Sequence, residues 1–492
     1  MGCGATRVKI NQNLASENPD SMNQSRCFNE SFIVENPKKF TDVYKMGGPL
    51  GSGAYGEVRM VTHRLTNQER AVKIYRKSLN CNSSYAKIKL EIEILKQLSH
   101  PIIVKIFEYF EDEKKVYIVL EKCDGGELFD EIFRRKFLSE NIAALIAKQL
   151  FSVVAYLHDK QIAHRDIKPE NILLEGEADF VNIKLIDFGA AISYLPKIKM
   201  SELIGSTFYI SPEVVNCNYT EKCDEWSCGV IIFILLCGSP PFPGRNDDDI
   251  VSKIKKGVFT FDKPIWQQVS SEAKDLINQL LCPEKHRLTA KQALQHPWIQ
   301  QQGTYPNPKT TLFISALENL KTFQSANKLK EAISMFITLQ VINIHDVKEL
   351  KELFKAIDKN GDGRLSREEI KEGILKLQGI DASDEHLKNI INEVDTDGDG
   401  FINYEEFIKA TLSENVIYSK ENLKKAFDMF DLDGSGKISL HEMVSVFKEN
   451  VVDKNTMVEF MKEADRNSDG EIDFDEFSGF FTRLSIRRKS LT

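Results

Sequence analysis

Hydrophobic and polar positions change their period several times along the 492-residue chain, and these changes divide it into regions. Residues 1–43 are rich in Asn, Ser and Gln without sustained periodicity, so we expect a flexible N-terminal extension. From residue 44 to 298, β-branched runs alternate with helical patterns, which predicts a domain of strands and helices. A polar stretch with two prolines, 299–310, indicates a linker, and 311–342 has helical spacing with few breakers.

The last third of the chain contains a sequence repeat, which occurs four times at spacings of 37, 36 and 34 residues. Each copy is an acidic twelve-residue segment with a central glycine, between segments of amphipathic helical spacing. The pattern predicts helix–loop–helix units in an all-helical region over residues 345–482, followed by a basic tail at 483–492. The four segments are 358–369, 395–406, 431–442 and 465–476.

Composition and charge refine this picture. Apolar residues make up 42% of the chain, and the most apolar run, Val230–Cys237, is much shorter than the ~20 residues that span a bilayer. We therefore expect this run to be a buried core element. The nine cysteines are odd in number and show no zinc spacing, and no secretory signal is recognisable, which predicts free thiols in a reducing cytoplasm.

Negative charge is concentrated in the repeat region. The whole chain has a net charge of −8, yet residues 345–492 carry 33 Asp and Glu against 22 Lys and Arg, a charge of −11. Acidic side chains therefore gather where the four loops lie, as cation binding would require.

A glycine-rich segment near the start of the mixed domain fits the pattern G-x-G-x-x-G-x-V, from Gly51 to Val58. Glycines of this kind let backbone N–H groups approach phosphate oxygens. The pattern also fits dinucleotide-binding folds, but in those folds an acidic residue follows about 20 positions later. This chain has Lys73 there. Further motifs follow in a fixed order, namely Ala71-Val72-Lys73, His164-Arg165-Asp166 with Asn171, and Asp187-Phe188-Gly189.

With this ordered set, the chain from Tyr44 to Trp298 resembles the eukaryotic Ser/Thr protein kinases. The resemblance implies a bilobal α+β kinase fold that binds ATP and Mg²⁺ and transfers the γ-phosphate to protein Ser or Thr. It implies that Lys73 binds the α- and β-phosphates and pairs with Glu91, with Glu93 as the less favoured partner. The implied ATP pocket consists of Leu50, Gly51, Gly53, Gly56, Val58, Ala71, Lys73, Leu120, Glu121, Cys123, Glu127, Leu173 and Asp187.

The same resemblance assigns roles in the transfer step. Asp166 is expected to orient the substrate hydroxyl and accept its proton, and Lys168 to contact the transferring phosphoryl group. Asn171 and Asp187 are expected to hold two Mg²⁺ ions. Since every charged catalytic position is filled, an inactive scaffold that only binds nucleotide is the less favoured alternative.

Positions outside the catalytic motifs carry predictions on regulation and substrates. Glu202 occupies the family's activation-loop phosphosite, so its carboxylate is expected to supply part of a phosphate's charge to Arg165. Glu213 is expected to pair with Arg287. Glu127 and Glu170 match acids that family members use for arginines upstream of the target, which predicts substrates with a basic residue about three positions before Ser or Thr; ordinary solvated acids are the alternative.

The four acidic loops meet the specification of EF-hand calcium sites, in which hard oxygens lie at positions 1, 3, 5, 7, 9 and 12. Position 7 donates only its carbonyl, so Arg364, Phe401, Lys437 and Glu471 are tolerated there. Position 8 is apolar in each loop, which predicts a short β-contact between paired loops. The remaining expected ligands are Asp358, Asn360, Asp362, Ser366 and Glu369; Asp395, Asp397, Asp399, Asn403 and Glu406; Asp431, Asp433, Ser435, Ser439 and Glu442; and Asp465, Asn467, Asp469, Asp473 and Glu476.

The linker and junction, residues 299–344, join the two halves. Apolar residues within 317–340 fall largely on one helical stripe, as in helices that an EF-hand lobe grips in an apolar groove. The whole arrangement resembles the calcium-dependent protein kinases of plants and protists. This implies that the junction helix inhibits the kinase at low calcium and is released when calcium binds. Substrate mimicry and an allosteric block both stay open, as does a constitutive kinase stabilised by its EF-hands.

The N-terminus fits an acylation signal. Gly2 matches the N-myristoylation pattern and Cys3 is a natural palmitoylation site, which together predict attachment to the cytoplasmic face of a membrane. An unmodified start of the chain is the alternative. We expect a monomer without a nucleic-acid partner.

Overall fold

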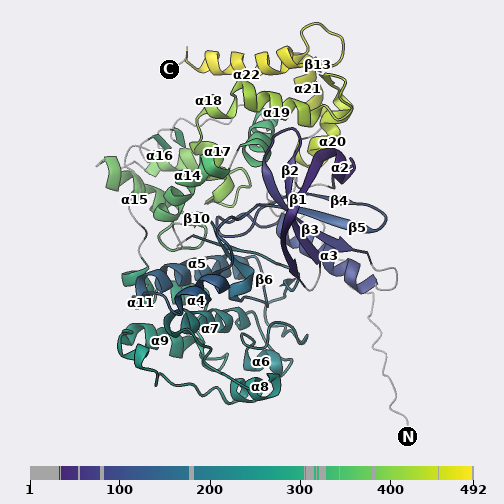
Figure 1. Ribbon diagram of the computed structural model, residues 1–492. Helices are drawn as coiled ribbons and strands as arrows, with labels where there is room; N and C mark the ends of the chain where they lie inside the picture. The colour runs from purple at the N-terminus through teal and green to yellow at the C-terminus, as the bar shows by residue number, and fades with distance from the viewer. Residues whose placement is uncertain are drawn as a thin grey trace, which may run out of the picture.

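The computed structural model describes residues 33, 35–53, 56–77, 82–176, 182–303, 305, 315–316, 319–320, 328–342, 344–378, 384–452 and 454–489. Two lobes form the first part of the chain, and the helices of the last third lie along one side of them (Figure 1). The expected bilobal α+β fold followed by a helical EF-hand region is confirmed.

A five-stranded antiparallel sheet with strand order β1-β2-β3-β5-β4 forms the N-terminal lobe. Both faces of β3 are covered, because Val72 and Ile74 pack in one apolar cluster while Tyr75 packs in another with α3. Coverage of both faces explains why every residue from Arg70 to Tyr75 is buried, although Arg70 and Lys73 are charged. The elements of this lobe are α2 (Phe40–Val43), β1 (Tyr44–Gly53), β2 (Gly56–His63), β3 (Glu69–Arg76), α3 (Asn82–Lys96), β4 (Ile106–Glu111) and β5 (Lys115–Leu120).

The predicted flexible extension 1–43 is wrong for its last part. Phe40 in α2 is 6% exposed and stacks on Tyr117 at 4.5 Å between ring centroids. The N–H of Asn36 donates to the carbonyl of Tyr109 at 2.9 Å. An aromatic anchor that buries on the sheet thus extends the domain to residue 35, which a polar composition did not reveal.

Helices α5 and α7 form the core of the C-terminal lobe. The predicted core element Val230–Cys237 lies in α7, and all its residues are buried. Within the described residues, α5 is the one helix long and apolar enough to cross a membrane, but 78% of its apolar window is buried, as in a core helix. The helices of this lobe are α4 (Leu128–Arg135), α5 (Glu140–Asp159), α6 (Pro212–Val215), α7 (Cys223–Cys237), α8 (Asp247–Lys256), η3 (Pro264–Gln267), α9 (Ser271–Leu280), α10 (Ala290–Leu294) and α11 (Pro297–Gln302).

Short antiparallel pairs between the lobes position the loops that carry the catalytic motifs. The pair β6–β9 brackets His164-Arg165-Asp166, and the pair β7–β8 ends just before Asp187. These elements are β6 (Ile162–Ala163), η2 (Pro169–Asn171), β7 (Ile172–Leu174), β8 (Ile183–Leu185) and β9 (Ile192–Ser193).

The longest described stretch of the junction is an α-helix, α13 (Lys328–Phe336), which continues as a π-helix, η4 (Ile337–Val341). Its apolar residues belong to the same core cluster as the EF-hand helices. Phe336, for example, lies 4.7 Å from Phe430 and 6.3 Å from Phe447 between ring centroids. The expected grip of the junction by the EF-hand region is therefore seen for residues 329–342.

The EF-hand helices form two pairs of helix–loop–helix units. Helices α14–α17 lie nearer the C-terminal lobe, and α19–α22 lie at the end of the molecule that carries the sheet (Figure 1). Helix α22 runs through Lys489, so the first residues of the predicted basic tail are helical. The elements are α14 (Ile344–Ile357), β10 (Arg364–Leu365), α15 (Arg367–Gln378), α16 (Asp384–Val394), β11 (Ile402–Asn403), α17 (Tyr404–Thr411), α18 (Glu414–Ile417), α19 (Lys420–Phe430), β12 (Lys437–Ile438), α20 (Leu440–Val451), α21 (Lys454–Ala464), β13 (Ile472–Asp473) and α22 (Phe474–Lys489).

Candidate active site and calcium sites

Lys73 on β3 lies at the centre of a buried charge cluster. Its Nζ is 2.8 Å from Glu91 on α3 and 2.6 Å from Asp187 in the loop after β8. Burial alone would lower the pKa of Lys73, but Glu91 and Asp187 outweigh it and raise that pKa well above its usual value. Glu93 pairs instead with Lys96, so the predicted preference for Glu91 is confirmed. The cation is thus fixed where it can meet phosphate oxygens.

Asp166 is held by neighbours on both of its oxygens. Oδ1 accepts from the Ser206 hydroxyl at 2.9 Å, and Oδ2 accepts from Asn171 Nδ2 at 3.1 Å. Lys168 Nζ lies 2.9 Å from Asp166 Oδ2 and donates to Ser206 Oγ at 2.8 Å. Asp166, Lys168 and Asn171 therefore converge on one spot as predicted, together with the hydroxyl of Ser206.

Asp224, at the start of α7, holds the backbone of the loop that carries His164, Arg165 and Asp166. Its carboxylate accepts the N–H of His164 at 2.9 Å and that of Arg165 at 2.8 Å. His158 Nε2 lies 3.0 Å from the same carboxylate. Burial would lower the pKa of His158, but Glu225 and Asp224 raise it to about 10. Sequence reasoning missed this anchor, because its members come together only through the packing of α5 against α7.

Two non-glycine residues in this region have left-handed backbone conformations, Arg165 with φ of 67° and Asp187 with φ of 61°. Such conformations cost about 1–3 kcal/mol and persist only where the surroundings enforce them. Phe188 supplies part of that enforcement, since it is 1% exposed and its ring meets the His164 ring edge-on at 4.9 Å. The packing of Phe188 thus helps to fix the backbone conformation of the predicted Mg²⁺ ligand Asp187.

The glycine-rich segment forms the turn between β1 and β2. A Cβ at Gly56 would lie 2.2 Å from the Ile74 carbonyl, so this glycine is required by the approach of β3. A Cβ at Gly51 would meet nothing within 4 Å, which leaves its backbone open to a ligand. In the expected adenine pocket, β3 and β5 place Ala71 directly opposite Leu120, and Glu127 bridges to Leu173.

Glu121, which the sequence places in the ATP pocket, uses its side chain in a buried ion pair. Its side chain is 5% exposed and lies 2.7 Å from Lys184 Nζ, facing the rear of the hinge. Only the backbone of Glu121 is therefore available to an adenine ring. The hinge composition was recognisable from the sequence, but the direction of this carboxylate depends on a lysine that becomes its neighbour only in the fold.

Glu202 reaches Arg165 as predicted. The two side chains lie 3.2 Å apart, and Lys87 on α3 lies 3.3 Å from the other Glu202 oxygen. Burial would raise the pKa of Glu202, but Arg165 and Lys87 lower it, so the carboxylate is ionised at neutral pH. The negative charge of Glu202 therefore connects its own segment to Arg165, next to the catalytic Asp166, and to Lys87 on α3.

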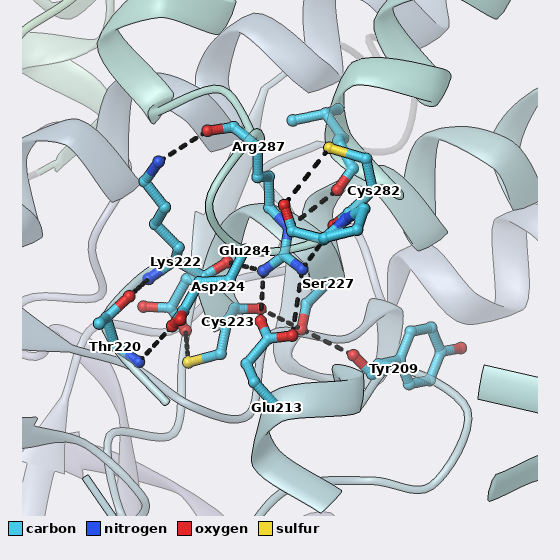
Figure 2. Close-up of polar contacts among 12 residues, drawn as sticks. Tyr209, Glu213, Thr220, Lys222, Cys223, Asp224, Ser227, Cys282, Glu284 and Arg287 are labelled. Atoms are coloured by element: carbon cyan, nitrogen blue, oxygen red, sulfur yellow. Dashed lines mark hydrogen bonds and ion pairs between the residues drawn. The ribbon is translucent and has the colours of Figure 1, made fainter. Parts of the chain in front are cut away.

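A second ion pair fixes the end of the activation segment. Arg287 approaches Glu213 with 2.5 Å between Nη1 and Oε1, and this predicted pair is confirmed. Figure 2 shows that Arg287 also donates to the carbonyls of Lys222 and Cys282 at 2.7 and 2.9 Å. The Ser227 hydroxyl donates to the Tyr209 carbonyl at 2.9 Å in the same view. The segment beside the substrate position is thus held on the helical lobe.

Three carboxylates gather between α4 and the catalytic loop, Glu127, Asp130 and Glu170. Burial, Asp130 and Glu170 raise the pKa of Glu127, which is the effect expected of a negative patch. Sequence reasoning named Glu127 and Glu170 but missed Asp130, although its place one turn along the same helix was a usable signal.

The four EF-hand loops share one backbone geometry. In each, the position-12 glutamate accepts the N–H of position 2 and that of position 9, as Glu369 does from Lys359 at 3.0 Å and from Ser366 at 2.9 Å. The position-6 glycines have φ between 79° and 88°. The predicted contact between position-8 residues is confirmed, since Leu365 pairs with Ile402 and Ile438 with Ile472.

The donor set of these loops fits calcium. Carboxylate oxygens of Asp395, Asp397 and Asp399 lie within 4.8 Å of one another, as do those of Asp431, Asp433 and Glu442. Burial and Asp399 raise the pKa of Asp397 to about 6, and burial and Asp397 raise that of Glu406 to about 7. A bound divalent cation would neutralise the repulsion among these converging carboxylate oxygens. Every predicted ligand residue of the four loops lies in the described part of the chain.

The first EF-hand pair contacts the expected kinase domain through residues that sequence reasoning did not single out. A Cβ at Gly363 would lie 2.3 Å from the His100 ring, so this loop fits the domain only with glycine there. Arg364 lies 3.3 Å from Asp159, and Lys355 donates to Asn182 at 3.0 Å. Lys351 pairs with Glu175, yet burial and the nearby Lys184 lower the pKa of Lys351 to about 7.

Several predicted features lie outside the described residues. These are the acylation residues Gly2 and Cys3 and most of the linker and junction between residues 304 and 327. Gly53 lies in the described part of the chain, where its backbone pairs with that of Gly56.

Comparison with known proteins agrees with these geometries. Residues 44–299 match the protein kinase domain family, and residues 347–412 and 420–482 match the EF-hand domain pair family. The chain is 40% identical over 483 residues to calcium-dependent protein kinase 4 of Plasmodium falciparum (isolate 3D7), covering 94% of this chain and 91% of that protein. It is 38% identical over 443 residues to calcium-dependent protein kinase 12 of Arabidopsis thaliana, covering 89% and 90%.

Proposed function

Since the chain belongs to the calcium-dependent protein kinase family, we propose that its junction segment, residues 317–340, is the element through which calcium controls the active site. The chain is an ATP-dependent Ser/Thr protein kinase with a calcium-binding EF-hand region. In the proposal, the junction inhibits the kinase domain at low calcium and is withdrawn when the EF-hands fill.

The active-site residues account for phosphoryl transfer. Asn171 and Asp187 would hold Mg²⁺, which would neutralise the charge of the γ-phosphoryl group that ATP supplies. Lys73, fixed by Glu91, orients the α- and β-phosphates. Asp166 accepts the hydrogen bond of the substrate hydroxyl and then its proton, while Lys168 compensates the charge of the departing phosphoryl group.

The observation that carries the proposal is the burial of the junction in the EF-hand core. Residues 332–342 are all buried, and Phe336 packs against Phe430 of the third unit and Phe447 of its second helix. A segment with so much apolar surface cannot stand alone in water, so the EF-hand groove and the kinase domain are competing places for it.

Two further parts of the proposal concern the surroundings of the enzyme. The acidic cluster of Glu127, Asp130 and Glu170 supports recognition of a basic residue upstream of the target Ser or Thr.

Gly2 and Cys3 support dual acylation and attachment to the cytoplasmic face of a membrane, because one acyl chain alone binds marginally.

The test replaces Phe336 by Ala or Asp in the full chain, with Leu375→Asp as control because Leu375 is 46% exposed on α15. Calcium binding is measured alongside to show that the EF-hands fold. We expect calcium to raise wild-type and control activity at least about tenfold, whereas the Phe336 variants stay near the activity seen in EGTA. Full calcium activation of both variants would contradict the role given to the junction.

A further inference from the structure

The four calcium loops differ in what surrounds the glycines at their positions 4 and 6. All these glycines have a left-handed backbone, with φ between 72° and 88°. In the first loop, a Cβ at Gly361 would lie 3.1 Å from Leu294, and one at Gly363 would lie 2.3 Å from His100. At these glycines, the first loop alone is therefore packed against the kinase domain. A Cβ would meet nothing within 4 Å at the corresponding glycines of the other loops, which are Gly398, Gly400, Gly434, Gly436 and Gly470.

The two kinase-domain residues in this contact are firmly held. His100 is 4% exposed, its Nδ1 accepts the N–H of Ile102 at 3.2 Å, and its Nε2 lies 3.2 Å from the Ser152 hydroxyl oxygen. Leu294, in α10, is 2% exposed and belongs to the apolar core of the kinase domain. Because side chains in a close-packed core cannot move aside cheaply, the turn of the first loop lies against a rigid surface.

Arg364, at position 7 of the first loop, extends the contact. This position offers only its carbonyl to a bound ion, so the side chain makes other contacts. It lies 3.3 Å from Asp159, at the end of α5, and 3.4 Å from Asp399 in the second loop. Lys437, at the same position of the third loop, lies 2.5 Å from Asp469 in the fourth. Both pairs of loops thus share a bond between partners, and the first pair adds a bond to the kinase domain.

This contact affects how an ion can leave the first loop. An EF-hand loop surrounds its ion with ligands from both ends, so release requires the N-terminal ligands to separate from the glutamate at position 12. Here Asp358 and Asp362 are expected on one side of the ion and Glu369 on the other. The turn around Asp362 lies against His100 and Leu294, and Asp358 is only 5% exposed. The surface of the kinase domain therefore blocks this separation while the first EF-hand pair stays in place.

We propose that the kinase domain is a cap that retains calcium in the first loop, through its contacts at His100, Leu294 and Asp159. The ion leaves this loop only after the first EF-hand pair has separated from the domain. By linkage, calcium in the first loop strengthens the contact by the same factor by which the contact strengthens calcium binding. Occupancy of the first loop therefore outlasts a fall in free calcium. This retention does not depend on the inhibitory role proposed for the junction.

Substitutions on the kinase side test the cap without changing any calcium loop. Asp159→Asn removes the charge that faces Arg364, and Asp159→Lys places a like charge there, on a side chain that is 26% exposed. Lys291→Met is the matched control, because Lys291 is another partner of Asp159, at 2.8 Å, and its loss leaves the bond to Arg364 in place. Calcium-loaded full-length protein is mixed with excess fluorescent chelator in a stopped-flow instrument. The traces give the rate of each phase of release and the number of ions in it.

We expect Asp159→Asn to speed the release of about one ion per protein about two- to threefold and Asp159→Lys about tenfold, with no change in Lys291→Met. The effect should vanish when Glu369→Gln removes calcium from the first loop, and it should persist when Glu442→Gln removes calcium from the third. Unchanged release in Asp159→Lys would overturn the cap, as would an equal acceleration in Lys291→Met. Acceleration that survives in the Glu369→Gln background would overturn the assignment to the first loop.

Discussion

The two functional regions of this kinase arrange charge in opposite ways. In the active site, carboxylates face cations: Glu91 and Asp187 meet Lys73, and Glu202 meets Arg165. In the EF-hand loops, carboxylates face one another, and burial with Asp362 and Glu369 raises the pKa of Asp358 well above its usual value. The active site is therefore assembled by the protein's own charges, whereas the loops are completed by a cation from solution. The calcium loops, and not the catalytic centre, are the natural point of control.

The largest expected effect is on the catalytic rate and tests the active site. Asp166→Asn keeps the shape of the side chain and its bond to Ser206, but removes the group that accepts the substrate proton. We expect kcat to fall about 10³-fold at saturating calcium and ATP. The ATP dissociation constant and the melting temperature should stay within error, because Asp166 is not needed to bind nucleotide. A loss of less than tenfold would show that Asp166 is not the acceptor.

A substitution of His158 tests how the stability of the kinase domain depends on pH. Its pKa is raised from 6.5 to about 10 in the folded protein, so its stabilising effect is full below pH 6.5 and declines as pH rises toward 10. His158→Gln should lower the free energy of unfolding by about 3 kcal/mol at pH 6.5. The difference from wild type should shrink steadily when urea unfolding is repeated up to pH 9.5. A difference that is constant over this range would contradict a charged His158.

A matched pair of substitutions sharpens the comparison. Glu91→Gln removes a carboxylate that faces Lys73, so it should lower the melting temperature of the calcium-free protein. Glu406→Gln removes one that faces Asp397, so it should raise that melting temperature while weakening calcium binding about 10–100-fold. Differential scanning calorimetry in EGTA and calcium titration supply the two readings. The contrast between the halves fails if both variants shift the melting temperature in the same direction.

The smallest effect concerns Glu202, whose side chain is 48% exposed. Exposed ion pairs contribute little, so Glu202→Gln should lower activity only about two- to fivefold. Glu202→Lys should lower it further, since it repels both Arg165 and Lys87. Peptide phosphorylation in calcium checks the order, with Asp262→Asn as the control because Asp262 is an exposed carboxylate of the same lobe.

The sequence allowed most of the fold and the catalytic set to be predicted, because each motif is local and its residue types are tied to one chemistry. Lys73, Asp166 and Asp187 needed only their neighbours in the chain to be recognised. Asp224 and His100 did not stand out, because their partners, the catalytic-loop amides and Gly363, come together only through tertiary packing. For the same reason the sequence placed Glu121 in the ATP pocket but gave no sign of its ion pair with Lys184 at the rear of the hinge.

The central claim is that calcium bound by the EF-hands sets the rate of phosphotransfer. The most direct measurement is transfer from Mg-ATP to an Arg-x-x-Ser peptide by the full chain, in excess EGTA and in micromolar free calcium. A variant with Gln at Glu369, Glu406, Glu442 and Glu476 serves as the control. The account predicts at least about tenfold activation of the wild type and none of the variant. Equal wild-type rates in EGTA and calcium would contradict it and leave a constitutive kinase.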